Sequence, residues 1–126
     1  MNTQNKILIV DDDVDLCNML EYYFNNLGYE AHVARRGAEA IRIARDARPD
    51  VILLDVELPD SDGYTVANAL RADRYTEHIP IVFLTAHGER EERLTALELG
   101  AADFIDKPFD AQELRLRVER LVKRGR

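Results

Sequence analysis

Three short apolar runs constrain the fold of this chain more than any other feature of its sequence. They occupy residues 7–10, 51–54 and 81–84, are rich in β-branched residues, and are each followed by apolar residues at helical spacing. A short buried helix can look similar, but this length and context favour strands buried on both faces of a parallel sheet. The alternation therefore predicts an α/β fold with right-handed crossovers and helices on both faces of the sheet.

Weaker patterns complete the predicted fold. We expect further strands at 30–34 and 102–105, and helices around 16–27, 40–44, 64–72, 89–99 and 114–122. Gly28 suits the C-terminus of the first helix, and the second helix should end before Pro49. Because no repeat, low-complexity tract or long linker interrupts the pattern, we expect one domain over residues 1–126.

The composition excludes several classes of protein. With 24 acidic and 17 basic residues the formal net charge is −7, which argues against nucleic-acid binding by this domain itself. No apolar run approaches the roughly 18–20 residues that span a bilayer, and no secretory h-region is present, so we expect no membrane association. The single cysteine, Cys17, cannot form an intramolecular disulfide and suits a reducing compartment. We therefore expect a soluble cytoplasmic domain.

Polar residues stand where the predicted strands end. Ligands of parallel α/β sheets bind in the crevice beyond the carboxyl ends of the strands. The residues at these points are Asp11, Asp12 and Asp13 after the first strand, Asp55 after the third, Thr85 after the fourth, and Asp106 and Lys107 after the fifth. Although they are far apart in sequence, we expect them to meet at one edge of the sheet.

This set of residue types suits phosphoryl transfer. Clustered carboxylates raise each other's pKa, and a hard divalent cation such as Mg²⁺ relieves their repulsion. Lys107 and Thr85 could bind the equatorial oxygens of a phosphoryl group, and a carboxylate can accept that group as an aspartyl phosphate. The glycine-rich loops of nucleotide sites are absent from the sequence.

Four segments carry a resemblance to a known family: residues 7–13, 53–59 with 62–63, 83–86 and 100–109. Over essentially its whole length the chain resembles the receiver domain of two-component response regulators, and most closely the receivers of winged-helix transcriptional regulators. The resemblance implies a flavodoxin-like (βα)5 three-layer sandwich with parallel strands in the order 2-1-3-4-5. It also implies a signalling domain that catalyses only its own phosphorylation and dephosphorylation.

The resemblance assigns a role to each acid of the predicted site. Asp55 would accept the phosphoryl group from a sensor histidine kinase. The side chains of Asp12 and Asp55 and the backbone carbonyl of Glu57 would bind Mg²⁺, and Asp11 would assist, partly through water.

It also assigns the residues that sense the phosphoryl group. Thr85 and Lys107 would contact it, and Phe104 would be the switch aromatic that turns inward when Thr85 moves. The Lys107–Pro108 bond would be cis. Ser61 departs from the bulky apolar residue common in the family, and Glu57 and His87 occupy positions that tune hydrolysis in a direction left open.

A charge pattern suggests how the signal leaves the domain. On the face formed by the fourth helix, fifth strand and fifth helix, the charged positions are Arg93, Asp103, Glu113 and Arg117. These match the reciprocal salt bridges through which winged-helix regulators pair, and Arg93 with Glu113 and Asp103 with Arg117 would suit a two-fold interface. We expect a phosphorylation-dependent homodimer, against the alternative that charge-rich helices carry mixed signs anyway.

Other functions remain as alternatives. A haloacid-dehalogenase-like aspartyl-phosphate hydrolase would use Asp11 as its nucleophile. Residues 11–14 match the first four positions of its DxDx[TV] pattern, but the chain lacks the later acidic pair. A pseudo-receiver would be a pure binding module. A flavin-binding flavodoxin is disfavoured because acids stand where its phosphate loop would lie.

Several residues have plainer interpretations. Asp13 suits the N-cap of the first helix better than a metal role. We expect Asp60 and Asp62 to be loop and helix-start acids, and Cys17 to pack in the core rather than do redox chemistry. Phe104 is as consistent with the core as with a switch, and the three histidines have no zinc-like spacing.

Overall fold

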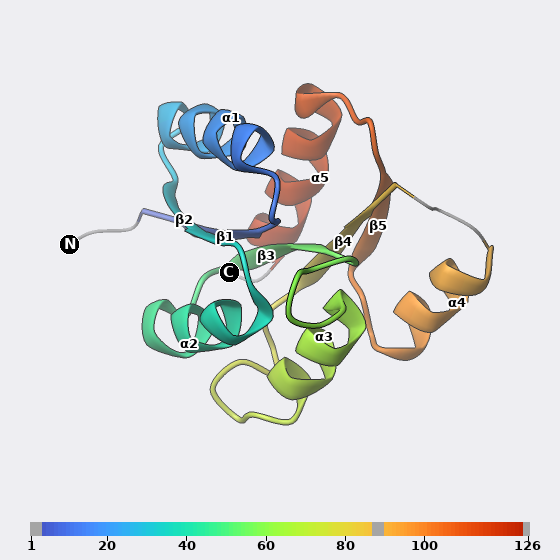
Figure 1. Ribbon diagram of the computed structural model, residues 1–126. Helices are drawn as coiled ribbons and strands as arrows, with labels where there is room; N and C mark the ends of the chain where they lie inside the picture. The colour runs from blue at the N-terminus through green and yellow to red at the C-terminus, as the bar shows by residue number, and fades with distance from the viewer. Residues whose placement is uncertain (1–3, 87–89, 125–126) are drawn as a thin grey trace.

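The computed structural model describes residues 4–86 and 90–124. Within these residues strands and helices alternate as predicted (Figure 1). The strands are β1 (Lys6–Val10), β2 (Glu30–Ala34), β3 (Val51–Asp55), β4 (Ile81–Thr85) and β5 (Asp103–Asp106). The helices are α1 (Val14–Asn26), α2 (Gly37–Ala47), α3 (Gly63–Arg71), α4 (Arg90–Glu98) and α5 (Ala111–Arg124). No helix in this part of the chain is both long and apolar enough to cross a bilayer.

The strands form one parallel sheet in the order β2-β1-β3-β4-β5, which confirms the predicted topology. The register aligns Val10 with Leu54, and Asp55 with Leu84. The carboxyl ends of the central strands therefore lie at one edge of the sheet. This alignment brings residues that are far apart in sequence to the same place.

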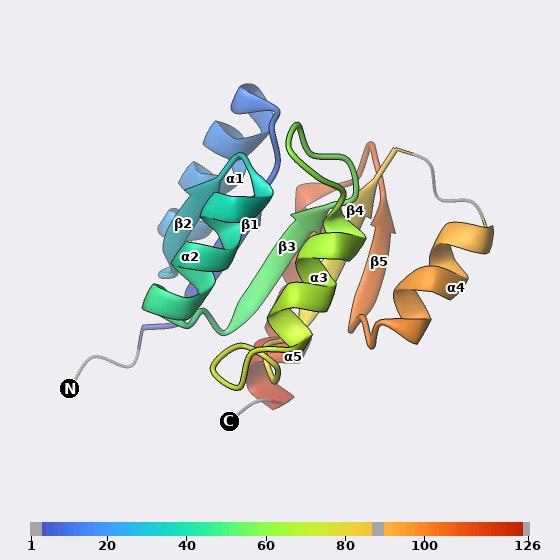
Figure 2. The same cartoon turned by 60° about the horizontal axis from the view of Figure 1, so that its bottom comes forward.

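Alternating side chains of the strands build a core on each face of the sheet. Ile7 and Ile9 pack with α1 and α5, whereas Leu8 and Val10 pack with α2, α3 and α4. Figures 1 and 2 show the same arrangement, with α1 and α5 on one side of the sheet and α2 and α3 on the other. The predicted three-layer sandwich is confirmed, and it explains why the strands are apolar on both faces.

The ends of the strands correct the sequence prediction by one residue. Asp55, Thr85 and Asp106 were expected to follow their strands, but each is the last residue of its strand. The reason is that pairing continues to the edge of the sheet, where Asp55 aligns with Leu84 and Thr85 with Asp106. The hydrogen bonds between the strands thereby hold the backbone of these residues.

Side-chain caps set the start of two helices beside this edge. Asp13 accepts a hydrogen bond from the Leu16 amide at 3.1 Å, so its predicted role as the N-cap of α1 is confirmed. Asp62 caps α3 in the same way, accepting from the Thr65 amide at 2.8 Å. Such caps satisfy amides that have no partner within the helix.

Candidate functional site

Three carboxylates meet at the carboxyl edge of the sheet. Asp11, Asp12 and Asp55 each offer an oxygen, and these oxygens all lie within 4.8 Å of one another. Asp11 is fully buried and Asp55 is 6% exposed, while Asp12 faces solvent. The sequence prediction that these acids converge is confirmed. Such a group of hard oxygen donors fits Mg²⁺.

Lys107 extends into this acidic group from the end of β5. Its Nζ lies 2.7 Å from Asp11 Oδ2 and 3.5 Å from Asp55 Oδ1. The Lys107 backbone amide donates to the Thr85 carbonyl at 2.6 Å, and the Lys107–Pro108 bond is cis, as the resemblance implied. Lys107 therefore places a positive charge beside the two buried carboxylates.

The surroundings shift the pKa values of both partners upward. Burial, together with the charge of Asp11, raises the pKa of Asp55 to about 6, against the opposing effects of Lys107 and the Glu57 amide. Burial lowers the pKa of Lys107, but its hydrogen bond to Asp11 and the charges of Asp11 and Asp55 outweigh this and raise it. Without a metal ion, Lys107 thus compensates the negative charge of Asp55 only in part.

The two buried aspartates differ in how closely their carboxylate oxygens are hydrogen-bonded. Asp11 Oδ1 accepts from the Asp13 amide at 3.0 Å, and Asp11 Oδ2 accepts from Lys107 at 2.7 Å. Among the residues that the structure describes, the contacts of Asp55 Oδ1 are longer, 3.4 Å from the Glu57 amide and 3.5 Å from Lys107 Nζ. Asp55 is therefore the carboxylate with more freedom to react.

The loop after β3 packs closely on the site. An isolated bridge joins Glu57 to Asp62, and the Gly63 amide donates to the Val56 carbonyl at 2.6 Å. A Cβ on Gly63 would collide with the Asp55 carbonyl oxygen, so only glycine fits there. The sequence places Gly63 just before the predicted helix at 64–72, and no local pattern in it reveals this close approach.

Thr85 is buried, and its hydroxyl donates to Glu92 Oε2 on α4 at 3.4 Å. The Glu92 carbonyl also accepts from the Tyr64 hydroxyl at 3.4 Å. Sequence reasoning did not single out Glu92, because nothing in its spacing distinguishes it from the other acids of a charged helix. The structure thus identifies an acid that holds the candidate switch residue.

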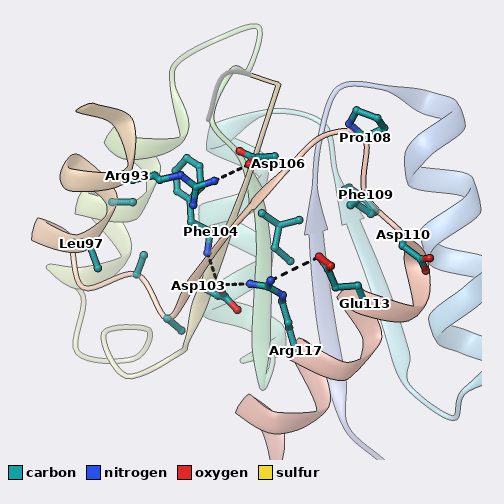
Figure 3. Close-up of a pocket in the computed structure, with 14 residues that line it drawn as sticks. Arg93, Leu97, Asp103, Phe104, Asp106, Pro108, Phe109, Asp110, Glu113 and Arg117 are labelled. Carbon is teal, nitrogen blue, oxygen red and sulfur yellow. Dashed lines mark hydrogen bonds and ion pairs between the residues drawn. The ribbon is translucent and has the colours of Figure 1, made fainter. Parts of the chain in front are cut away.

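Figure 3 shows the predicted output face, which lines a cavity of about 590 Å³. Arg93 pairs with Asp106 at 2.6 Å, and its guanidinium lies 4.8 Å from the centre of the Phe104 ring. Arg117 pairs with Asp103 at 2.9 Å and with Glu113 at 3.7 Å. The four predicted charges do lie on one face, but within the chain Arg93 pairs with Asp106 rather than Glu113.

The remaining predictions divide into those that hold and those that need correction. Cys17 is buried in the core as expected; its thiol donates to the Asp11 carbonyl at 3.1 Å, and burial raises its pKa to about 11. Phe104 is partly buried with its ring 6.5 Å from that of Phe83, between core and surface. Asp60 is more than a loop acid, because it accepts from two amides of α2. His87 lies outside the described residues.

Fold and site together define a class of protein: an α/β domain with a lysine-paired acidic pocket at the carboxyl edge of a 2-1-3-4-5 sheet. Residues 7–119 match the family model of the response regulator receiver domain. The chain belongs to this family, and is therefore a signalling module of two-component systems rather than a conventional enzyme.

Individual relatives agree with this assignment. The chain is 39% identical over 124 residues to a probable transcriptional regulator, ycf27, of Guillardia theta, covering 98% of this chain and 48% of that protein. It is 37% identical over 119 residues to the DNA-binding dual master transcriptional regulator RpaA of Synechocystis sp., covering 94% and 49%. The chain spans about half the length of these curated relatives.

A solved structure shares the fold closely. A putative response regulator from Chloroflexus aurantiacus has a TM-score of 0.89 and 38% sequence identity, with 96% of this chain and 99% of that chain covered. Membership in this family disfavours the hydrolase alternative, in which Asp11 would be the nucleophile.

Proposed function

We propose that this chain is a phosphorylation-activated switch of a cytoplasmic two-component system. Asp55 accepts a phosphoryl group from the phosphohistidine of a sensor histidine kinase. An Asp55 oxygen attacks phosphorus, the P–N bond breaks, and its electron pair returns to the imidazole. Family membership supports the reaction class, and the pocket supports the residue assignment.

The difference in hydrogen bonding between the two buried aspartates is the observation that carries this assignment. Both Asp11 oxygens accept close hydrogen bonds, from the Asp13 amide and from Lys107. Within the described part of the chain, the contacts of Asp55 Oδ1 are 3.4 Å and 3.5 Å long, so weaker hydrogen bonds must be broken when this carboxylate attacks. The same contrast argues against Asp11 as the nucleophile of a hydrolase.

Magnesium would be held by the side chains of Asp12 and Asp55 and the backbone carbonyl of Glu57, with Asp11 assisting partly through water. When bound, the ion supplies charge that neutralises the phosphoryl oxygens during transfer. The donor set supports this choice, because its ligands are oxygens, and because burial and the nearby charge of Asp11 raise the pKa of Asp55.

Thr85 and Lys107 would bind the transferred group and start the response. Lys107 already reaches both buried acids, so a small shift of its Nζ brings it to an oxygen on Asp55. Thr85 must give up its contact with Glu92 to donate to the phosphoryl group. That exchange removes one of the contacts that hold α4, and Phe104 then turns inward.

An apolar groove beside the pocket supports docking of the kinase. It has a volume of about 380 Å³ and is lined in part by Leu16, Met19, Phe109 and Lys107. Met19 is 44% exposed although it is apolar. A helix that presents a phosphohistidine could bury this surface while its phosphate reaches Asp55.

The output would be a homodimer formed through α4, β5 and α5. Its reciprocal pairs would be Arg93 with Glu113 and Asp103 with Arg117. In the single chain these side chains already have partners, so dimerisation exchanges ion pairs rather than adding them. Exposed pairs contribute little energy singly, so they would set the register of the dimer. Because its curated relatives are named as transcriptional regulators, we propose that the dimer controls transcription.

The test is labelling by acetyl phosphate, with and without Mg²⁺, followed by mass spectrometry. We expect the wild type to gain one phosphoryl group on Asp55 only when Mg²⁺ is present, and Asp55→Asn to gain none. Asp15→Asn, at an exposed acid of α1, is the matched control and should label normally. Phosphate on Asp11 would favour the hydrolase, and no labelling at all would favour a pure binding module.

Sedimentation of the same samples tests the output. The beryllofluoride-treated wild type should form dimers, and Arg93→Glu should weaken them while a paired Arg93→Glu/Glu113→Arg change should restore them. A wild type that stays monomeric with and without beryllofluoride at high concentration would contradict the dimer.

A further inference from the structure

The N-terminus of α2 is capped by a side chain from a different part of the chain. The residue at the local N-cap position, Arg36, makes no side-chain capping bond. Instead, Asp60 Oδ1 accepts from the Gly37 amide at 2.8 Å, and Asp60 Oδ2 accepts from the Ala38 amide at 3.2 Å. One carboxylate from the loop between β3 and α3 thus satisfies two helix amides that lack partners within the helix.

Two small residues let this loop come so close. A Cβ on Gly37 would lie 2.7 Å from Ser61 Oγ and 2.8 Å from Val66 Cγ2. Ser61 is the position that departs from the bulky apolar residue common in the family. Its small side chain allows the loop to lie directly on the start of α2.

The same loop forms one wall of the phosphorylation site. It is closed on itself by the bond from the Leu58 amide to the Ser61 carbonyl at 3.1 Å and by the bridge between Glu57 and Asp62. Glu57 therefore belongs to the same small closed unit as Asp60. A tether at one end of this unit limits the movement of the other.

The electrostatics favour the tether. A carboxylate at a helix N-terminus is stabilised by the partial positive charge of the first amides. The bonds from the Gly37 and Ala38 amides accordingly lower the pKa of Asp60. Asp60 is exposed, so its position depends on these bonds rather than on burial.

We propose that Asp60 is a positioning residue: by binding the N-terminus of α2 it holds the loop after β3 in the shape that places the Glu57 carbonyl for Mg²⁺. The claim that the loop places the Glu57 carbonyl for Mg²⁺ rests on the proposed function. The claim that Asp60 holds the loop concerns the metal-free chain. Asp60 itself touches neither the metal nor the phosphoryl group.

A pair of variants separates tethering from simple helix capping. Asp60→Ala removes the cap and the tether together. Adding Arg36→Ser to it restores a local cap, because residue 36 already has the extended backbone of an N-cap, but the tether stays broken. Asp46→Ala, at an exposed acid of α2, controls for the loss of one negative charge.

Two readouts are needed. In metal-free protein, hydrogen exchange of the Leu58 and Gly63 amides should be faster in Asp60→Ala and equally fast in the double variant. Titration with Mg²⁺ by calorimetry should give a dissociation constant raised up to about tenfold in both variants, with the midpoint of unfolding recovered only in the double variant. Asp46→Ala should match the wild type in exchange and affinity.

The outcomes that overturn the inference are distinct. If Asp60→Ala exchanges and binds Mg²⁺ like the wild type, the tether does not exist. If Arg36→Ser restores loop protection and affinity as well as stability, Asp60 is only a cap. If the wild type binds no Mg²⁺, the proposed function fails, and the exchange rates still decide whether Asp60 holds the loop.

Discussion

Helices α3 and α4 have the same length, nine residues, and pack on the same face of the sheet, yet they are held very differently. Helix α3 buries Gly63, Val66, Ala67 and Leu70. Among the α4 side chains that are described, residues 92–98, Ala96 alone is buried. Leu94 and Leu97 are 47% and 68% exposed. Figure 2 shows α4 at the margin of the sheet beside β5.

The contacts at the ends of these helices differ in the same way. Helix α3 starts with a side-chain cap and lies against the backbone of Asp55. Helix α4 is joined to its neighbours by polar contacts, from Glu92 to Thr85 and from Arg93 to Asp106. The side of the acidic pocket next to α3 is thus held by the core, whereas α4 is held by contacts of small energy. This division suits a switch, because phosphorylation can only shift an element whose two states differ little in free energy.

The largest effect on stability is expected from a leucine truncation in α3, compared with a matching truncation in α4. Leu70→Ala should lower the free energy of unfolding by about 2–5 kcal/mol, because it leaves a cavity in the core. Leu97→Ala should change it by less than about 0.5 kcal/mol, because that side chain is already exposed. Denaturation in urea measures both. Equal losses would show that α4 is as firmly packed as α3, and the comparison would fail.

A second effect on the free energy of unfolding is expected from the buried charge of Asp55. Because the folded state raises the pKa of Asp55 from 3.8 to about 6, folded protein binds this proton more tightly than unfolded protein does. The free energy of unfolding should therefore fall as the pH rises through that interval. Without metal, Asp55→Asn should be more stable than the wild type above pH 6, on the order of 2 kcal/mol, with the gain shrinking toward pH 4.

Denaturant unfolding in EDTA between pH 5 and pH 8 measures this gain. Adding Mg²⁺ should stabilise the wild type alone and narrow or reverse the difference. An Asp55→Asn variant that is less stable than the wild type in EDTA at pH 8 would contradict the prediction.

A smaller effect is expected at the cap of α3. Asp62→Ala should lower the free energy of unfolding by about 1 kcal/mol, because the Thr65 amide loses its acceptor. Asp62→Ser keeps a capping oxygen and should recover most of the loss. If both variants behave alike in urea denaturation, the cap contributes nothing to the firm anchoring of α3.

The smallest effect on stability is expected at the output face. Asp106→Asn removes an ion pair whose side chains are 43% and 52% exposed, so the loss should be under about 0.5 kcal/mol. The Phe104 ring should nevertheless change its surroundings, because Arg93 loses one of the contacts that place it above the ring. Nuclear magnetic resonance of the Phe104 ring tests this. A large loss of stability with an unchanged ring would mean that α4 is anchored there.

Much of the fold and pocket could be predicted because periodicity and strand ends are local signals. The apolar runs at 7–10, 51–54 and 81–84 lie in β1, β3 and β4, and the acids after them meet as expected. The placing of Asp55 and Thr85 inside their strands was missed, because the end of a strand depends on its neighbour. Glu92 and Asp60 were missed as partners, because their contacts join segments with no shared pattern.

Residue order alone specified the alternation of strands and helices and the chemistry available at the sheet edge, since these depend on side-chain type and spacing. Only the folded chain decided which oxygen of which aspartate is occupied, which arginine pairs with which acid, and which loop caps which helix. Those choices depend on distances of a few ångströms between elements packed across the sheet, and a linear pattern does not encode them.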